Sequence, residues 1–377
     1  MRHLVAVLLL LQPSLAAAQR IVLVPMEARV PQPPSPVPAD GKVWLNYELV
    51  LTNVGPRDLG LAGLEVLTRD GRVVHRLERP DMASSLTRFG GRDSTNPRVI
   101  GAGKSAVLFL WMGLAPGAVP TGVRHRILTT RADSLETAAP DTLLTGVVEV
   151  LGPAVTLGAP LRGGPWVAGN GPGNLSGHRR TRIPLEGSAK IAQRFATDWL
   201  KYGPDGRAWQ GDSTVNANWY GHGEPLLAVA DGQVVAIKDG IPENVPLTPE
   251  RAVPITLETV GGNYVIVDIG GGRFAFYAHL VPGSVAVQVG DRVRRGQVLG
   301  KLGNSGNSDA PHLHFHLGDG PTPLGSEGLP FTIDRFEQLG KRGSIMEALM
   351  KPWLGPGDPA DVRRGELPLD NAVVRFP

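Results

Sequence analysis

The stretch NSGNSDAPHLHFHL, residues 304–317, places three histidines at alternate positions: His312, His314 and His316. Successive side chains of a β-strand point to opposite faces, so these three rings would be neighbours on one face. Pro311 suits the first residue of a strand, and the Gly/Asn/Ser run before it is typical of a turn. The stretch therefore predicts a strand whose face is either a solvated row of histidines or a metal site with a proton-transfer partner beside it.

The residues before this stretch extend the same pattern. Residues 273–317 contain four of the nine histidines and several Gly-Asp and Gly-Gln turn signals, which predicts a compact all-β region. Within it, alternation places Phe274, Phe276 and Ala278 on one face of a strand. His279 is then expected on the opposite face.

The first third of the chain also has strand patterns. Residues 42–53 alternate cleanly, and residues 61–77 form two runs around Asp70-Gly71, a hairpin signal. Further runs occupy residues 104–114 and 141–152. Short strands separated by turns predict an immunoglobulin-like β-sandwich over residues 19–152.

The remaining chain divides by composition. Residues 153–190 are dense in Gly, Pro, Arg and Asn, which predicts a linker or an irregular lead-in. Strand signals resume at Ile191 and continue to residue 336, defining a second β domain. Residues 337–377 form a C-terminal tail with one short helix predicted at residues 344–354.

The N-terminus and the overall charge indicate the cellular setting. Residues 1–18 contain Arg2, an apolar run over residues 4–11 and small residues at the end, the layout of a cleaved signal peptide. The run is too short for a membrane span. A formal net charge of +3 gives no reason to invoke nucleic acid, and the absence of cysteine excludes disulfides. We expect a periplasmic or secreted protein.

Six motifs of the second half occur in an order that resembles lysostaphin/LytM-type zinc metallopeptidases, which cut the peptide cross-links of bacterial cell walls. They are QRFATDW, GEPLLAVADGQVV, GNYVIVDIG, YAHLVPGSV, VGDRVRRGQVLGKLGNSGNS and PHLHFHL. The resemblance covers residues 191–336. It implies a β-sandwich of the barrel-sandwich hybrid type, one zinc ion, and peptidoglycan peptide as the bound partner.

The resemblance also implies roles for individual residues. In that family, zinc is bound by the His and Asp of a His-x-x-x-Asp strand and by the second His of His-x-His. Asp198 matches the Asp, and His314 matches the last ligand. His312 and His279 match the family's catalytic pair. Zinc chemistry suits this set, because zinc acidifies a bound water and an adjacent imidazole can take the proton.

One ligand of the family pattern is missing. Arg194 stands four residues before Asp198, and a guanidinium has no lone pair for a metal. His178 or His222 would then be the third ligand, and we favour His178 on reach alone. The alternative is a metal-free member that binds wall peptide and activates other hydrolases.

In the metal-free alternative, Arg194 forms a salt bridge with Asp198. His316 has no family role, and we expect a surface residue or a partner of one of the ligands.

Overall fold

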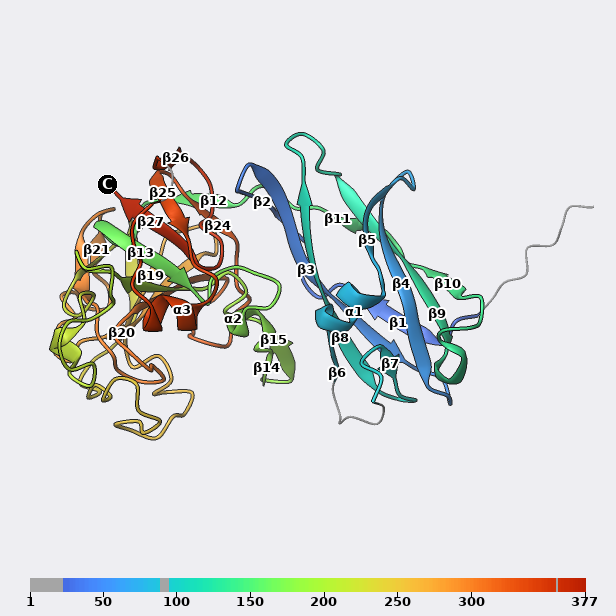
Figure 1. The fold of residues 1–377 in the computed structure, drawn as a ribbon, viewed down its shortest axis with the longest axis horizontal. Coiled ribbons are helices and arrows are strands. Elements are labelled where there is room, and N and C mark those ends of the chain that lie inside the picture. The colour runs from blue at the N-terminus through green and yellow to red at the C-terminus, as the bar shows by residue number, and fades with distance from the viewer. Residues whose placement is uncertain (1–22, 89–94, 357–358) are drawn as a thin grey trace, which may run out of the picture.

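The structure, a computed structural model, describes residues 23–88, 95–356 and 359–377. Two β-rich domains lie side by side along the long axis of the molecule (Figure 1). This confirms the predicted all-β class. None of the helices in the described ranges is long and apolar enough to cross a membrane. The predicted signal peptide, residues 1–18, lies outside the described residues.

The N-terminal domain is a sandwich of two antiparallel sheets with an apolar core between them. One sheet contains β1 (Met26–Arg29), β2 (Pro36–Ala39), β3 (Lys42–Asn53), β6 (Leu86–Arg88) and β8 (Ser105–Leu114). The other contains β4 (Leu59–Thr68), β5 (Val73–Leu77), β7 (Val99–Ile100), β9 (Gly122–Arg131), β10 (Asp141–Leu144) and β11 (Val148–Glu149). The short helix α1 (Arg79–Ser85) and the 3-10 helix η1 (Ala132–Ser134) connect strands.

The alternating patterns locate most of these strands. β3 coincides with the predicted strand at residues 42–53, and β4 and β5 form the predicted hairpin. The run at residues 141–152 splits into β10 and β11, which both pair with β9. Strand β9 was not predicted, although it lies between β10 and β4 in its sheet.

The C-terminal domain is built on one long sheet of ten strands in the described residues. In spatial order these are β21 (Arg292–Val293), β18 (Gly232–Lys238), β19 (Asn263–Asp268), β20 (Phe274–Leu280), β23 (Leu313–Gly318), β16 (Thr197–Lys201), β13 (Gly163–Gly169), β27 (Ala372–Phe376), β25 (Phe336–Lys341) and β26 (Asp361–Arg363). Three two-stranded pairs accompany it: β12 (Val155–Leu157) with β24 (Phe331–Ile333), β14 (Ile183–Leu185) with β15 (Ser188–Lys190), and β17 (Pro225–Leu227) with β22 (Val298–Lys301). The helices are α2 (Gly177–Arg180), η2 (Asn216–Asn218) and α3 (Ile345–Met350).

Two predicted boundaries are wrong. Residues 153–190 are no linker, because β13 lies inside the long sheet between β16 and β27. Residues 337–377 are no irregular tail, because β25 and β27 pair within the same sheet. The predicted helix in that segment is present as α3. Strand β13 was not predicted because its segment is rich in glycine and proline. Its pairing depends on strands that are distant in the sequence.

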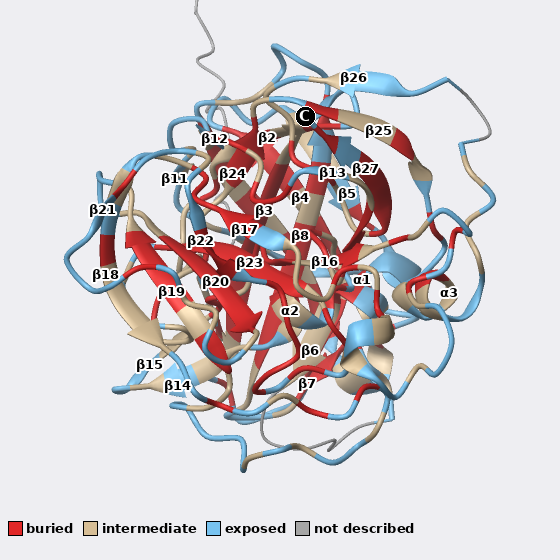
Figure 2. Cartoon of the chain, turned by 90° about the vertical axis from the view of Figure 1, so that its left-hand side faces the viewer, coloured by how far each residue is buried: buried red, intermediate tan, exposed pale blue. Residues whose placement is uncertain are grey.

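Strand β23 lies deep inside the domain and has two buried faces. Leu313, Phe315 and Leu317 belong to the main apolar core of the domain. His314 and His316 are buried on the other face at 3% and 1% exposure. Figure 2 shows β23, β20 and β16 as a buried centre surrounded by more exposed loops. The core face therefore anchors the strand and holds the histidines in place.

Candidate functional site

The site begins with a strand pair. Asp198 on β16 and His314 on β23 are directly opposite each other in the antiparallel register. Opposed side chains on one face of such a pair are about 5 Å apart at Cβ. The Asp198 carboxylate oxygen Oδ1 accepts a hydrogen bond from Nδ1 of His314 at 2.9 Å. These two positions, predicted as ligands from the family pattern, are therefore adjacent.

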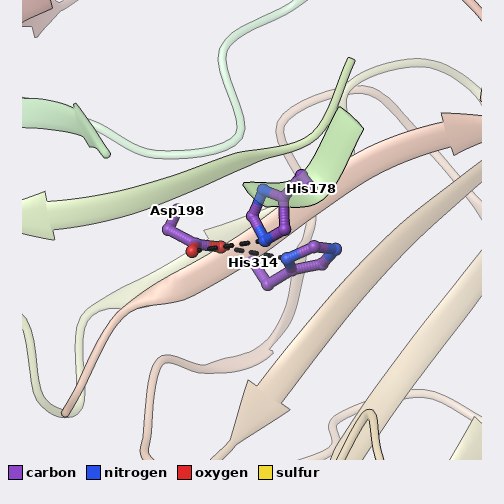
Figure 3. A group of neighbouring side chains, drawn as sticks. All are labelled: His178, Asp198 and His314. Atoms are coloured by element: carbon purple, nitrogen blue, oxygen red, sulfur yellow. Dashed lines mark hydrogen bonds and ion pairs between the residues drawn. The ribbon is translucent and has the colours of Figure 1, made fainter. Parts of the chain in front are cut away.

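His178 reaches the same carboxylate from α2. Its Nε2 lies 3.4 Å from Oδ2 of Asp198, and its ring stands edge-on to His314 with centroids 4.8 Å apart. Nδ1 of His178 donates to the backbone carbonyl of Asn170 at 3.0 Å, since a carbonyl oxygen can only accept. The neutral ring then has its lone pair on Nε2, facing Asp198. The ligand atoms of His178, Asp198 and His314 all lie within 4.8 Å of one another (Figure 3).

His312 and His279 form the second part of the site. Their rings are 4.9 Å apart, and Nε2 of His312 lies 3.4 Å from Oδ1 of Asp198. Nδ1 of His312 donates to the carbonyl of Ala310 at 2.8 Å, and Nδ1 of His279 donates to that of Ser305 at 2.8 Å. Each neutral ring is thus fixed in the tautomer that has Nε2 as the proton acceptor.

The predicted orientation of His279 is wrong. Alternation placed it opposite Phe276 and Ala278, whereas all three line the same cavity. His279 has a φ of 67°, and the register between β19 and β20 shifts between Asn263 and Val265. A non-glycine residue with a left-handed backbone is uncommon, and such strained positions cluster at functional sites. The irregularity turns His279 toward His312.

His316 is a buried partner of a candidate ligand and is not a surface residue. Its Nδ1 lies 2.9 Å from Nε2 of His314, and its ring packs against Phe276 at 4.8 Å. Histidines that bind metals almost always have a hydrogen-bond partner on the other ring nitrogen, which orients them. His316 is positioned to provide that partner for His314.

Burial and charge together set the ionisation of these groups. Burial alone would raise the pKa of Asp198, but attraction to His178 and His312 holds this pKa well below its usual range. Burial, reinforced by repulsion from His312 and His314, lowers the pKa of His279 well below its usual value. Burial likewise lowers the pKa of His314. Burial alone would lower the pKa of His312, but attraction to Asp198 raises it. The ionised carboxylate of Asp198 beside the uncharged rings of His279 and His314 is a set of electron-pair donors suited to a cation.

The ion pairs of Arg194 contradict the predicted salt bridge between Arg194 and Asp198. Its guanidinium points to the domain boundary and pairs with Glu48 at 2.9 Å and Glu327 at 2.8 Å. His222, the other candidate ligand, pairs with Glu243 at 3.1 Å and is outside the group around Asp198. Of the two histidines considered for the third position, the structure brings His178 to Asp198.

A cavity of about 620 Å³ opens onto the site. His178, Asp198, His279, His312 and His314 all line it. Its other walls include apolar side chains from the loop before β24, from β14 and from α3, namely Ile183, Leu324, Ile345, Met346 and Leu349. A mostly apolar cleft with a few convergent polar groups is typical of a ligand site.

Comparison with known proteins points to one family. Residues 219–324 match the model described as peptidase family M23. The chain is 31% identical over 116 residues to glycyl-glycine endopeptidase ALE-1 of Staphylococcus capitis, which covers 30% of this chain and 27% of that protein. It is 41% identical over 56 residues to peptidoglycan DD-endopeptidase ShyA of Vibrio cholerae, which covers 15% of this chain and 13% of that protein. The chain thus spans about a quarter or less of these relatives.

Two solved structures are similar to parts of the chain. The catalytic domain of a mutant of the prophage-encoded M23 protein EnpA from Enterococcus faecalis shares 21% identity and a TM-score of 0.27, covering 45% of this chain and 92% of that one. The catalytic domain of lysostaphin from Staphylococcus simulans shares 22% identity and a TM-score of 0.22, covering 34% of this chain and 88% of that one.

Proposed function

Because residues 219–324 are a domain of peptidase family M23, we propose that this chain is a zinc endopeptidase acting on peptide cross-links of bacterial peptidoglycan. The observation that carries the proposal is the convergence of His178, Asp198 and His314 on one point beside His279 and His312. Relatives named as glycyl-glycine and DD-endopeptidases support the substrate class.

The residues present fit a zinc ion. Zinc in catalytic sites takes three protein ligands at about 2.0–2.2 Å from nitrogen or oxygen, with a fourth position open. Nε2 of His178 and the oxygens of Asp198 already face each other. When Nε2 of His314 donates to His316, Nδ1 of His314 has its lone pair toward Asp198. The three side chains would hold the metal, with His178 in the place of the histidine that Arg194 replaces.

Different side chains of the site would then have different roles in peptide hydrolysis. Zinc held there supplies Lewis acidity, which brings the pKa of a water molecule near neutrality. His312 and His279 each present Nε2, so one of them can accept the proton of the attacking water. The other, when protonated, donates a hydrogen bond to the oxygen that becomes negative as the peptide carbonyl is attacked. The apolar wall around Ile345 would contact the peptide on the side facing α3.

The proposal includes export to the periplasm or the exterior, where peptidoglycan is found. Support for export comes from the basic start, apolar run and small residues of positions 1–18. Amino-terminal sequencing of the protein secreted by its native host tests this step. A mature chain beginning at Gln19 is expected, whereas a chain that retains residues 1–18 contradicts export with cleavage.

The first experiment measures zinc per mole of protein after dialysis against metal-free buffer. We expect close to one zinc in the natural chain, loss of zinc in His178→Ala, and retention in the matched control His222→Ala. The same samples are incubated with purified peptidoglycan, and newly released amino groups are counted. A folded natural chain that binds essentially no zinc would overturn the proposal and would indicate a wall-binding module.

A further inference from the structure

A buried ionic cluster joins the two domains beside α2, the helix that carries His178. Glu48, on β3 of the N-terminal sandwich, accepts hydrogen bonds from Nε of Arg179 at 3.1 Å and from Nε of Arg194 at 2.9 Å. The three side chains are 2%, 0% and 3% exposed, respectively. Glu327 completes the cluster as a second partner of Arg194. One carboxylate of the first domain therefore holds two arginines of the second.

Arg179 immediately follows His178 in α2. Its Nη2 donates to the backbone carbonyls of Tyr47 at 3.0 Å and Leu110 at 2.8 Å, both in the N-terminal domain. Its guanidinium also lies over the rings of Phe109 and Trp111 of that domain. Most of the contacts of this side chain are thus made across the domain boundary.

The helix has little stability of its own. It is four residues long, and its N-cap residue Ser176 makes no side-chain capping hydrogen bond. A single helical turn is unfavourable in isolation because nucleation fixes several dihedral angles for one hydrogen bond. The place of His178 therefore depends on contacts outside α2. These contacts are the hydrogen bond from His178 to the Asn170 carbonyl and the contacts that Arg179 and Arg180 make with the N-terminal domain, where Arg180 lies over the Phe109 ring at 4.2 Å.

Arg194 connects the same carboxylate to the other side of the site. It precedes β16, the strand of Asp198, and its Nη1 donates to the carbonyl of Gly328 at 3.0 Å. Glu48 thus links the turn before Asp198 to the helix that carries His178. The residue that replaces a family ligand is engaged in this link.

We propose that Glu48 is a positioning residue for the metal site and that the N-terminal sandwich completes the site by fixing His178 against Asp198. The inference rests on the proposed function, because it takes His178 as a zinc ligand. It gives the first domain the role of holding one zinc ligand, His178, in position. The cluster works through geometry, since Glu48 itself lies outside the set of residues that line the cavity.

The test measures zinc affinity in the full chain by competition with a chromophoric chelator. Glu48→Gln keeps the size of the side chain and removes its charge, and we expect zinc to bind at least about tenfold more weakly, as for other residues that support metal ligands. The matched control is Val50→Ala, which removes an apolar contact of the same boundary, where Val50 packs with Ile191, and leaves the ionic cluster intact. Its zinc affinity should change less than about threefold.

A double-mutant cycle separates positioning from general loss of structure. If Glu48 acts through His178, Glu48→Gln should add less than about twofold to the loss already caused by His178→Ala. Hydrogen exchange of the metal-free chain provides a second readout. Residues 174–181 should exchange faster in Glu48→Gln than in the natural chain, with residues 197–201 unchanged.

The outcomes are distinct. If the natural chain and Glu48→Gln bind zinc equally well and exchange equally fast at residues 174–181, this inference is overturned. The proposed function then still stands. Additive losses in the cycle would also overturn it. A natural chain without zinc would overturn both proposals. Should Glu48→Gln not fold, Arg179→Lys, which keeps the charge but loses the forked contacts, replaces it with the same expected results.

Discussion

Replacing Arg194 by histidine tests whether the position four residues before Asp198 is available to the site. The substitution restores the family's ligand type, yet we expect a less stable protein and no gain in metal binding. Arg194 is 3% exposed and donates to Glu48, Glu327 and Gly328. Its loss leaves Glu48, itself 2% exposed, with Arg179 as the remaining cation. Removing one partner of a buried ion pair costs about 3–5 kcal/mol.

The assay has two parts. Urea unfolding gives the change in free energy, and Arg375→His is the control, since Arg375 pairs with Glu337 in a solvent-exposed position where a pair is worth about 1 kcal/mol or less. Zinc affinity is then compared between His178→Ala and the double variant His178→Ala/Arg194→His. Equal and weak binding is expected from both. Recovery of zinc binding in the double variant, or a stability loss no greater than in the control, would refute the reasoning.

Three further predictions concern single histidines. His312→Gln should retain zinc and lower kcat on peptidoglycan by about 10²–10⁴-fold, the range for loss of a general acid or base, whereas loss of zinc from this variant would place His312 among the ligands. His316→Leu removes the partner of Nε2 of His314, so zinc affinity should fall about 10–100-fold in the chelator assay, and unchanged affinity would exclude a supporting role. Burial lowers the pKa of His125, which contacts the Tyr47 hydroxyl at 2.8 Å, to about 4. Below the unfolded pKa of about 6.5, the folded state therefore binds fewer protons than the unfolded state. The free energy of unfolding of the natural chain should fall by about 3 kcal/mol between pH 6.5 and pH 4 because of this residue. Urea unfolding at several pH values should show this loss absent in His125→Gln, and an equal loss in both chains would contradict it.

Much of the fold was determined locally by the sequence. Alternating apolar residues located β3, β4, β5 and β8, because a half-buried strand imposes a period of two. This local pattern does not predict which strands pair when they are distant in the sequence. The cost of bringing such segments together is offset by contacts that no local window contains, and β13 and β27 enter the long sheet in this way.

The sequence, through its resemblance to a known family, also predicted Asp198, His279, His312 and His314 as site residues and offered His178 as a candidate third ligand. Only the tertiary structure decided that His178 meets Asp198, that a left-handed backbone turns His279 inward, and that Arg194 serves the domain boundary. The physical reason is that a metal site requires atoms within a few ångströms of one another. In the positioning role proposed for Glu48, that proximity depends on a buried carboxylate about 130 residues earlier in the chain than Arg179.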